Sequence, residues 1–180
     1  MKSIIDIGCG EGKLLKLLLS NKQFEKIAGT DVSFTNLLKA KERLNFEEMS
    51  QKFKERTELF QSSAIYKDKK FLNYESCAIV EVIEHIEIDR IESFEKSIFE
   101  YSKFNYIILT TPNADYNINY KNLNKQNLRH SDHRFEWTKE EFKSWVDKIS
   151  EKYKYNAKIS GVGEFDEKNG FPTQVVEFSL

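Results

Sequence analysis

Two carboxylates and one imidazole, those of Glu81, Glu84 and His85, fall within five consecutive residues directly after an apolar run. A strand that ends at this point would direct all three side chains toward one place. Carboxylate oxygens and imidazole nitrogens together bind divalent cations, although a complete site needs further ligands from elsewhere in the chain. Taken alone, the same pattern occurs more often in solvated loops than in metal sites. The assignment of a metal site therefore depends on the rest of the sequence.

The chain contains three histidines, and all of them lie in two short stretches. His85 belongs to the first stretch, whereas His130 and His133 lie in the segment Leu128–Trp137. Imidazole is a common metal ligand, so a histidine from the second segment is the natural complement to the first. The confinement of histidine to these two stretches is the most informative feature of the sequence.

A short apolar strand at the N-terminus runs into a glycine-rich turn and then into a helix. Glycines allow the backbone to approach a ligand closely, and the helix N-terminus offers free N–H groups. A dinucleotide-binding fingerprint requires its third glycine where Lys13 stands, and no Gly-Lys-Ser/Thr phosphate loop is present. The pattern Asp6-x-Gly8-x-Gly10-x-Gly12 instead resembles the first motif of S-adenosylmethionine-dependent methyltransferases.

Two further polar positions follow predicted strands. The predicted strand 26–31 ends on Asp31, which in a doubly wound sheet is placed to accept hydrogen bonds from the ribose hydroxyls of an adenosine. The competing interpretation is that Asp31 only caps the helix that begins after Ser33. The predicted strand 57–63 has a polar exit, where a hydroxyl such as that of Ser63 could reach the adenine edge.

Strands and helices alternate along the chain and end in two strands, with a long irregular segment at 114–137. After the first strand and a helix at 13–19, we expect strands at 26–31, 57–63, 76–81, 104–113, 154–160 and 173–178, and helices at 33–56, at 89–101 and from a capping box at Thr138. This alternation predicts an α/β, Rossmann-like doubly wound sheet of about seven strands with an antiparallel edge. Residues 1–180 should form a single domain, without the covering helix that usually precedes the first strand in methyltransferases.

The bulk composition excludes several classes of protein. Charged residues make up 32% of the chain and cancel to a net charge of -1, so no broad basic surface is expected to attract a polyanion. No apolar run is long enough to cross a bilayer, and no signal peptide is expected. Cys9 and Cys77 are interpreted as small buried residues in a reducing compartment. The composition favours a cytoplasmic protein without a membrane partner.

Four stretches resemble, in order and approximate spacing, the HEN family of small-RNA 3′-terminal 2′-O-methyltransferases. They are Asp6–Gly12, Glu81–His85, Thr110–Asn113 and Arg129–Thr138. The first is generic to methyltransferases, whereas the second and fourth are specific. The resemblance implies S-adenosylmethionine as cofactor, with contacts at Asp6, Gly8, Gly10, Asp31 and Ser63. It also implies a divalent metal ion, Mg²⁺ or Mn²⁺, held by Glu81, Glu84, His85 and His133.

The implied substrate is the 3′ end of a small RNA, expected to be single-stranded, and the candidate partner that presents it is a protein of the Argonaute or Piwi type. A terminal ribose with free 2′ and 3′ hydroxyls can chelate a metal ion, which lowers the pKa of the 2′ hydroxyl so that it attacks the methyl group. The expected catalytic residues are His130, Glu84 and His85. Either His130 or a ligand carboxylate could accept the proton. Mixed nitrogen and oxygen ligands suit manganese or cobalt at least as well as magnesium.

Other side chains near the second histidine stretch are candidates for RNA contacts. Arg129, Arg134, Lys121 and Lys125 could bind phosphates, although a solvated loop is an equally good interpretation of the two lysines. Tyr116, Phe135 and Trp137 could stack on terminal bases, although aromatic residues beside a strand more often belong to the core.

Two other functions remain open at this point. A methyltransferase of the same fold that acts on a small molecule would be active without metal. An inactive module that binds RNA or a protein would not bind the cofactor despite its glycine-rich turn.

Overall fold

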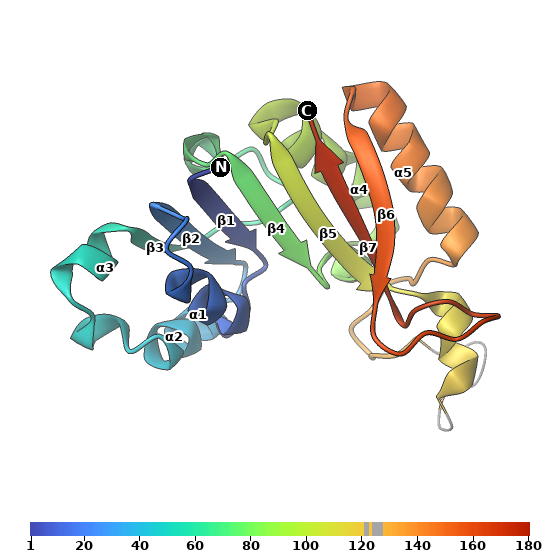
Figure 1. The fold of residues 1–180 in the computed structure, drawn as a ribbon, viewed down its shortest axis with the longest axis horizontal. Coiled ribbons are helices and arrows are strands. Elements are labelled where there is room, and N and C mark those ends of the chain that lie inside the picture. The colour runs from blue at the N-terminus through green and yellow to red at the C-terminus, as the bar shows by residue number, and fades with distance from the viewer. Residues whose placement is uncertain (121–122, 124–127) are drawn as a thin grey trace.

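In the computed structural model, which describes residues 1–120, 123 and 128–180, seven strands form one mixed sheet (Figure 1). The strands are β1 Ser3–Ile7, β2 Lys26–Asp31, β3 Thr57–Gln61, β4 Ser76–Val80, β5 Tyr106–Pro112, β6 Asn156–Val162 and β7 Thr173–Ser179. Their order is β3-β2-β1-β4-β5-β7-β6, and β7 is antiparallel to both of its neighbours. The prediction of a doubly wound sheet with an antiparallel edge is confirmed.

The parallel strands in the middle of the sheet are buried on both faces, as their continuous apolar sequences require. Because β1, β2, β4 and β5 are parallel, their carboxyl ends lie at one edge of the sheet. The register places Val80 beside Thr110, so the residues that follow β4 lie next to the end of β5. This edge therefore collects the polar residues that follow each strand.

Helices cover both faces of the sheet (Figure 1). They are α1 Lys13–Ser20, α2 Phe34–Arg43, α3 Gln51–Glu55, α4 Ile91–Glu95 and α5 Lys139–Tyr153, with the π-helical turn η5 Lys96–Ser102 continuing α4. The short 3-10 turns are η1 Phe46–Glu48, η2 Lys69–Asn73, η3 Ile83–His85, η4 Ile88–Arg90 and η6 Ala114–Asn119. Among the described residues, no helix is long and apolar enough to cross a membrane.

The predicted helix at 33–56 is wrong in its length. The chain leaves the helical conformation at Asn45, which adopts a left-handed backbone with φ 49°, and then forms η1 and α3. Asparagine tolerates this conformation better than most residues, so it ends α2 after the buried Leu44. By contrast, α5 begins where predicted, because Thr138 and Glu141 form a complete capping box.

Two apolar clusters hold the helices against the sheet. One cluster, which includes Phe94, Trp145 and Phe178, lies between the sheet and the pair α4 and α5. The other, which includes Leu15 and Leu37, lies between the opposite face and the pair α1 and α2.

The aromatic residues proposed to stack on RNA bases instead pack inside the protein. Phe135 and Trp137 lie against the first cluster, and Tyr116 is buried.

Candidate active site

A cleft of about 580 Å³ opens at the carboxyl edge of the sheet. Its walls come from the residues that follow β1, β2, β3 and β4, including Gly8, Asp31, Ser63, Glu81 and His85. Of the predicted cofactor residues, Gly8, Asp31 and Ser63 line this cleft, whereas Asp6 and Gly10 do not. The cleft occupies the position at which doubly wound folds bind nucleotides.

The glycine-rich turn is shaped by backbone conformations that favour glycine. Gly8 has φ 79°, and a Cβ atom there would lie 2.5 Å from a methyl group of Val82. The Gly10 amide donates a hydrogen bond of 2.8 Å to Oδ2 of Asp31, which ties the turn after β1 to the end of β2. Glycine at position 8 therefore allows Val82 to pack closely against the turn, and Asp31 fixes the shape of the turn beside it.

Asp31 does not cap α2. Its Oδ1 atom accepts a hydrogen bond of 2.8 Å from the Ser33 amide, and Ser33 itself caps the helix by accepting from the Asn36 amide. Asp6 lies close behind, and burial, together with the charge of Asp31, raises its pKa to about 7. Burial thus disfavours the charged form of Asp6, and Asp31 is the one of the two carboxylates that lines the cleft.

Glu84, His85 and His133 lie together, each offering one ligand atom within 4.8 Å of the others, and His85 also lines the cleft. Glu84 and His85 belong to η3, which directly follows β4. The loop that carries His133 docks there, because the Arg134 amide donates a hydrogen bond of 2.7 Å to the Glu84 carbonyl. The two predicted histidine stretches thus meet, and three of the four predicted metal ligands are adjacent.

Glu84 carries the clearest sign of a cation site. Its side chain is fully buried, Oε2 accepts a hydrogen bond from Thr111, and Oε1 has no hydrogen-bond partner among the described residues. Burial is the main cause that raises its pKa to about 8, with the nearby carboxylates of Glu81 and Glu136 adding to the effect. A divalent cation would satisfy the free oxygen and favour the ionised carboxylate, so these residues fit such an ion.

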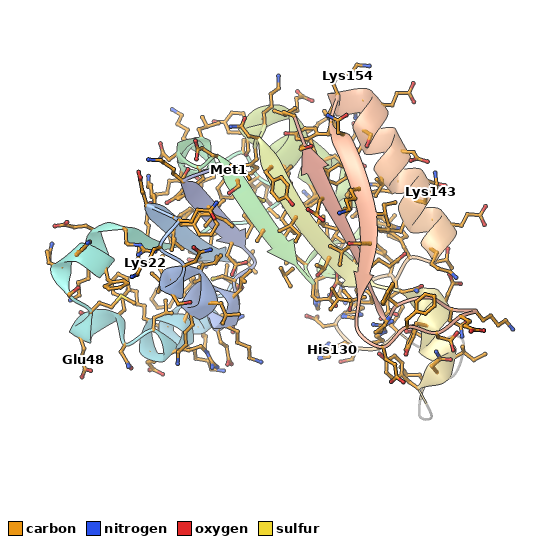
Figure 2. The ribbon with its side chains drawn as sticks, viewed as in Figure 1. Met1, Lys22, Glu48, His130, Lys143 and Lys154 are labelled. Atoms are coloured by element: carbon orange, nitrogen blue, oxygen red, sulfur yellow. The ribbon has the colours of Figure 1, made fainter. Side chains whose placement is uncertain are left out.

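Glu81 and His130 stand apart from this group of three. Glu81 has a left-handed backbone with φ 53°, lines the cleft, and accepts a hydrogen bond of 2.8 Å from Thr110. The His130 ring lies 5.7 Å from that of His133 and 6.4 Å from that of His85, measured between centroids. Figure 2 labels His130 beyond the carboxyl ends of the central strands.

The two histidines of the group use their Nδ1 atoms to contact the protein. Nδ1 of His85 lies 3.1 Å from the Asp132 carbonyl oxygen, and Nδ1 of His133 lies 2.6 Å from Oε1 of Glu136. Contacts of this kind orient imidazole ligands in metal sites and leave Nε2 as the free nitrogen. Glu136 and Thr111 were missed by the sequence reasoning, although the spacing of Glu136, three residues after His133, is a usable signal.

The predicted phosphate contacts have a different role in the structure. The Arg129 guanidinium binds Oδ1 of Asn117 at 2.6 Å and the Asn113 carbonyl at 2.7 Å, while Arg134 pairs with Glu87 at 2.7 Å. Both side chains therefore stabilise the loop around the histidines. Lys121 and Lys125 lie outside the described residues.

Comparisons with known proteins agree with this geometry. A family model described as a methyltransferase domain matches residues 1–149. Small RNA 2′-O-methyltransferases from Tetrahymena thermophila and Rattus norvegicus are 32% and 30% identical to the chain, and each match covers 98% of it. These matches cover 45% and 46% of the two relatives, so the chain spans about half the length of the curated relatives it matches.

Solved structures give the same assignment. The methyltransferase domain of bacterial CtHen1 superposes with a TM-score of 0.90 at 45% identity, covering 99% of this chain and 90% of that one. The small RNA methyltransferase HEN1 superposes with a TM-score of 0.88 at 28% identity, covering 99% of this chain and 23% of that one. The chain therefore belongs to the HEN family of methyltransferases.

Proposed function

We propose that this chain transfers a methyl group from S-adenosylmethionine to the 2′ hydroxyl of the 3′-terminal nucleotide of a small RNA. The observation that carries the proposal is the position of His85, which lines the nucleotide-type cleft and also belongs to the group with Glu84 and His133. A methyl donor in the cleft and a ribose at the metal ligands would then be neighbours. The relatives named as small RNA 2′-O-methyltransferases support the choice of substrate.

Different residues of the cleft would contact different parts of the cofactor. Asp31 would accept hydrogen bonds from the ribose hydroxyls, Ser63 would contact the adenine edge, and Gly8 would leave room for the methionine part. In the part of the chain that the structure describes, four carboxylates line the cleft, those of Asp31, Glu81, Glu87 and Asp132. Their negative potential suits a ligand that carries a positively charged sulfonium.

The acceptor ribose would lie at Glu84, His85 and His133, with Glu81 as a fourth ligand from the cleft wall. A divalent ion bound there would supply Lewis acidity, lowering the pKa of a chelated hydroxyl. His130 is poorly arranged as proton acceptor, because its Nδ1 atom already accepts a hydrogen bond of 3.1 Å from the Asp132 amide. Its neutral ring then carries the proton on Nε2, so we favour a ligand carboxylate as the base.

Methyl transfer to defined RNA ends tests the proposal. A short single-stranded RNA with a free 3′ diol is compared with the same RNA ending in a 3′ phosphate or a 2′-deoxynucleotide, with Mn²⁺ or with chelator. We expect labelled methyl only on the free diol and only with metal. Transfer to blocked ends, or indifference to chelator, would favour the small-molecule methyltransferase instead.

We further propose that residues 1–180 act as one methyltransferase domain on the single-stranded 3′ end of the RNA. The mixed ligand set favours Mn²⁺ at least as strongly as Mg²⁺.

This role fits a cytoplasmic location and a partner protein of the Argonaute or Piwi type that presents the RNA end. Binding of the domain to such a protein loaded with RNA, measured against the empty protein, tests the partner.

Arg90 is the candidate for a phosphate contact near the RNA end. Of the described residues that line the cleft, it alone carries a permanent positive charge, and no carboxylate pairs with it among them, since Glu87 is bound by Arg134. We expect Arg90→Ala to raise KM for RNA about tenfold, and to reduce its salt dependence, because one charge-assisted contact is lost. Initial rates at several salt concentrations measure both effects.

The control for Arg90 is Lys96→Ala. Lys96 is a nearby cation at the start of η5, where it pairs with Glu92. This variant should keep the KM of the native protein. If Arg90→Ala instead weakens binding of S-adenosylhomocysteine and leaves KM for RNA unchanged, Arg90 holds the carboxylate of the cofactor rather than a phosphate.

A further inference from the structure

Glu136 is a fully buried carboxylate directly behind the metal-ligand candidate His133. Its oxygens accept two hydrogen bonds, from the Arg129 amide at 2.7 Å and from Nδ2 of Asn117 at 2.5 Å, and Nδ1 of His133 lies 2.6 Å from Oε1. Both amides donate to this carboxylate, and the 2.6 Å contact is a hydrogen bond of the same kind when Nδ1 of His133 carries the proton and donates it.

The partners of Glu136 are themselves fixed to the sheet. Arg129 donates from Nε to Oδ1 of Asn117 and from Nη2 to the carbonyl oxygen of Asn113. Asn113 directly follows β5, is 1% exposed, and uses its own amide group to bind the carbonyls of Asn169 and Phe171. Glu136 therefore cannot follow a reorientation of the His133 ring without breaking this network.

We propose that Glu136 is a positioning residue that fixes the tautomer and the ring orientation of His133. A neutral imidazole has one N–H and one lone pair, and only the lone pair can bind a cation. Because the Nδ1 proton is held by Glu136, the lone pair stays on Nε2, the nitrogen left for the group with Glu84 and His85.

The role as metal ligand rests on the proposed function, but the tautomer of His133 can be measured without metal or RNA. Long-range ¹H–¹⁵N correlation spectra of the metal-free protein distinguish the Nδ1–H and Nε2–H forms. We expect the Nδ1–H form in the native protein and a shift toward Nε2–H in Glu136→Gln. Mn²⁺ affinity, followed by electron paramagnetic resonance, should fall about 10- to 100-fold in the same variant.

Glu95 provides a matched control, because its side chain is equally buried. It accepts hydrogen bonds from Trp145 and Lys148 on the side of the sheet covered by α5. Glu95→Gln should change neither the tautomer nor the Mn²⁺ affinity. Glu136→Asp keeps the charge, so it should retain the Nδ1–H form and part of the affinity even if Glu136→Gln does not fold.

Two results would each overturn a different part of the proposal. An unchanged tautomer and unchanged Mn²⁺ affinity in Glu136→Gln would remove the positioning role. A native protein that shows the Nδ1–H form but binds no Mn²⁺ would instead remove the metal site, and with it the proposed chemistry.

Discussion

Replacing Glu84 by glutamine is expected to reduce metal-supported methyl transfer by about 1000-fold, because a neutral amide cannot replace a carboxylate ligand. Glu84 is the buried member of the group, and its free Oε1 atom is the oxygen that a cation would satisfy. Losing it removes the buried negative charge that would balance a divalent ion at this site. Initial rates with Mn²⁺, together with direct Mn²⁺ titration, measure the effect.

The fold should survive this change. Glutamine has the shape of glutamate, and its oxygen can still accept the hydrogen bond from Thr111. The pKa of Glu84, raised to about 8, shows that the buried site disfavours a negative charge when no cation is present. The thermal unfolding temperature of the metal-free variant should therefore be no lower than that of the native protein.

His133→Ala provides a second test from a different segment of the chain. It should also abolish metal-supported transfer, since it removes a ligand that only the docked loop supplies. Glu95→Gln, which changes an equally buried glutamate outside the site, should leave the rate unchanged. If Glu84→Gln transfers methyl groups at the native rate, the metal is not held by this group of residues.

The fold was largely predictable because its signals are local. The glycine-rich turn, the apolar strands and the capping box at Thr138 each depend on a few adjacent residues, and the alternation of elements then restricts the sheet order. The end of α2 was missed, because one left-handed residue, Asn45, interrupts a sequence whose composition favours helix throughout. Charged residues with a broken apolar stripe do not reveal such a break.

The residues of the candidate site could be predicted from the sequence, but their arrangement in space was less predictable. Glu81 and Glu84 differ by three positions, yet the left-handed backbone at Glu81 turns its carboxylate toward Thr110 and leaves Glu84 buried. The side-chain directions after a strand depend on such backbone angles, which the spacing of apolar residues in the sequence does not reveal. Glu136 was missed for another reason, since its partners Asn117 and Arg129 lie 19 and 7 residues before it, at no regular spacing.

Replacing Asp31 by alanine is expected to weaken cofactor binding about 100-fold. If its carboxylate accepts hydrogen bonds from both ribose hydroxyls, about 3 kcal/mol of binding free energy depends on it. The variant also frees the Gly10 amide, which Asp31 now binds at 2.8 Å, so the glycine-rich turn loses its support. Calorimetric titration with S-adenosylhomocysteine measures the combined loss.

The two contributions of Asp31 can be separated with a change of ligand. If the carboxylate contacts the ribose, the native protein should prefer adenosine over 2′-deoxyadenosine, and Asp31→Ala should lose this preference. Ser33→Ala is the control, because it removes the cap of α2, at about 1 kcal/mol of stability, and leaves the cleft intact. A native protein without preference between the two nucleosides would show that Asp31 acts only through the turn. The alanine variant would then weaken the binding of both nucleosides equally.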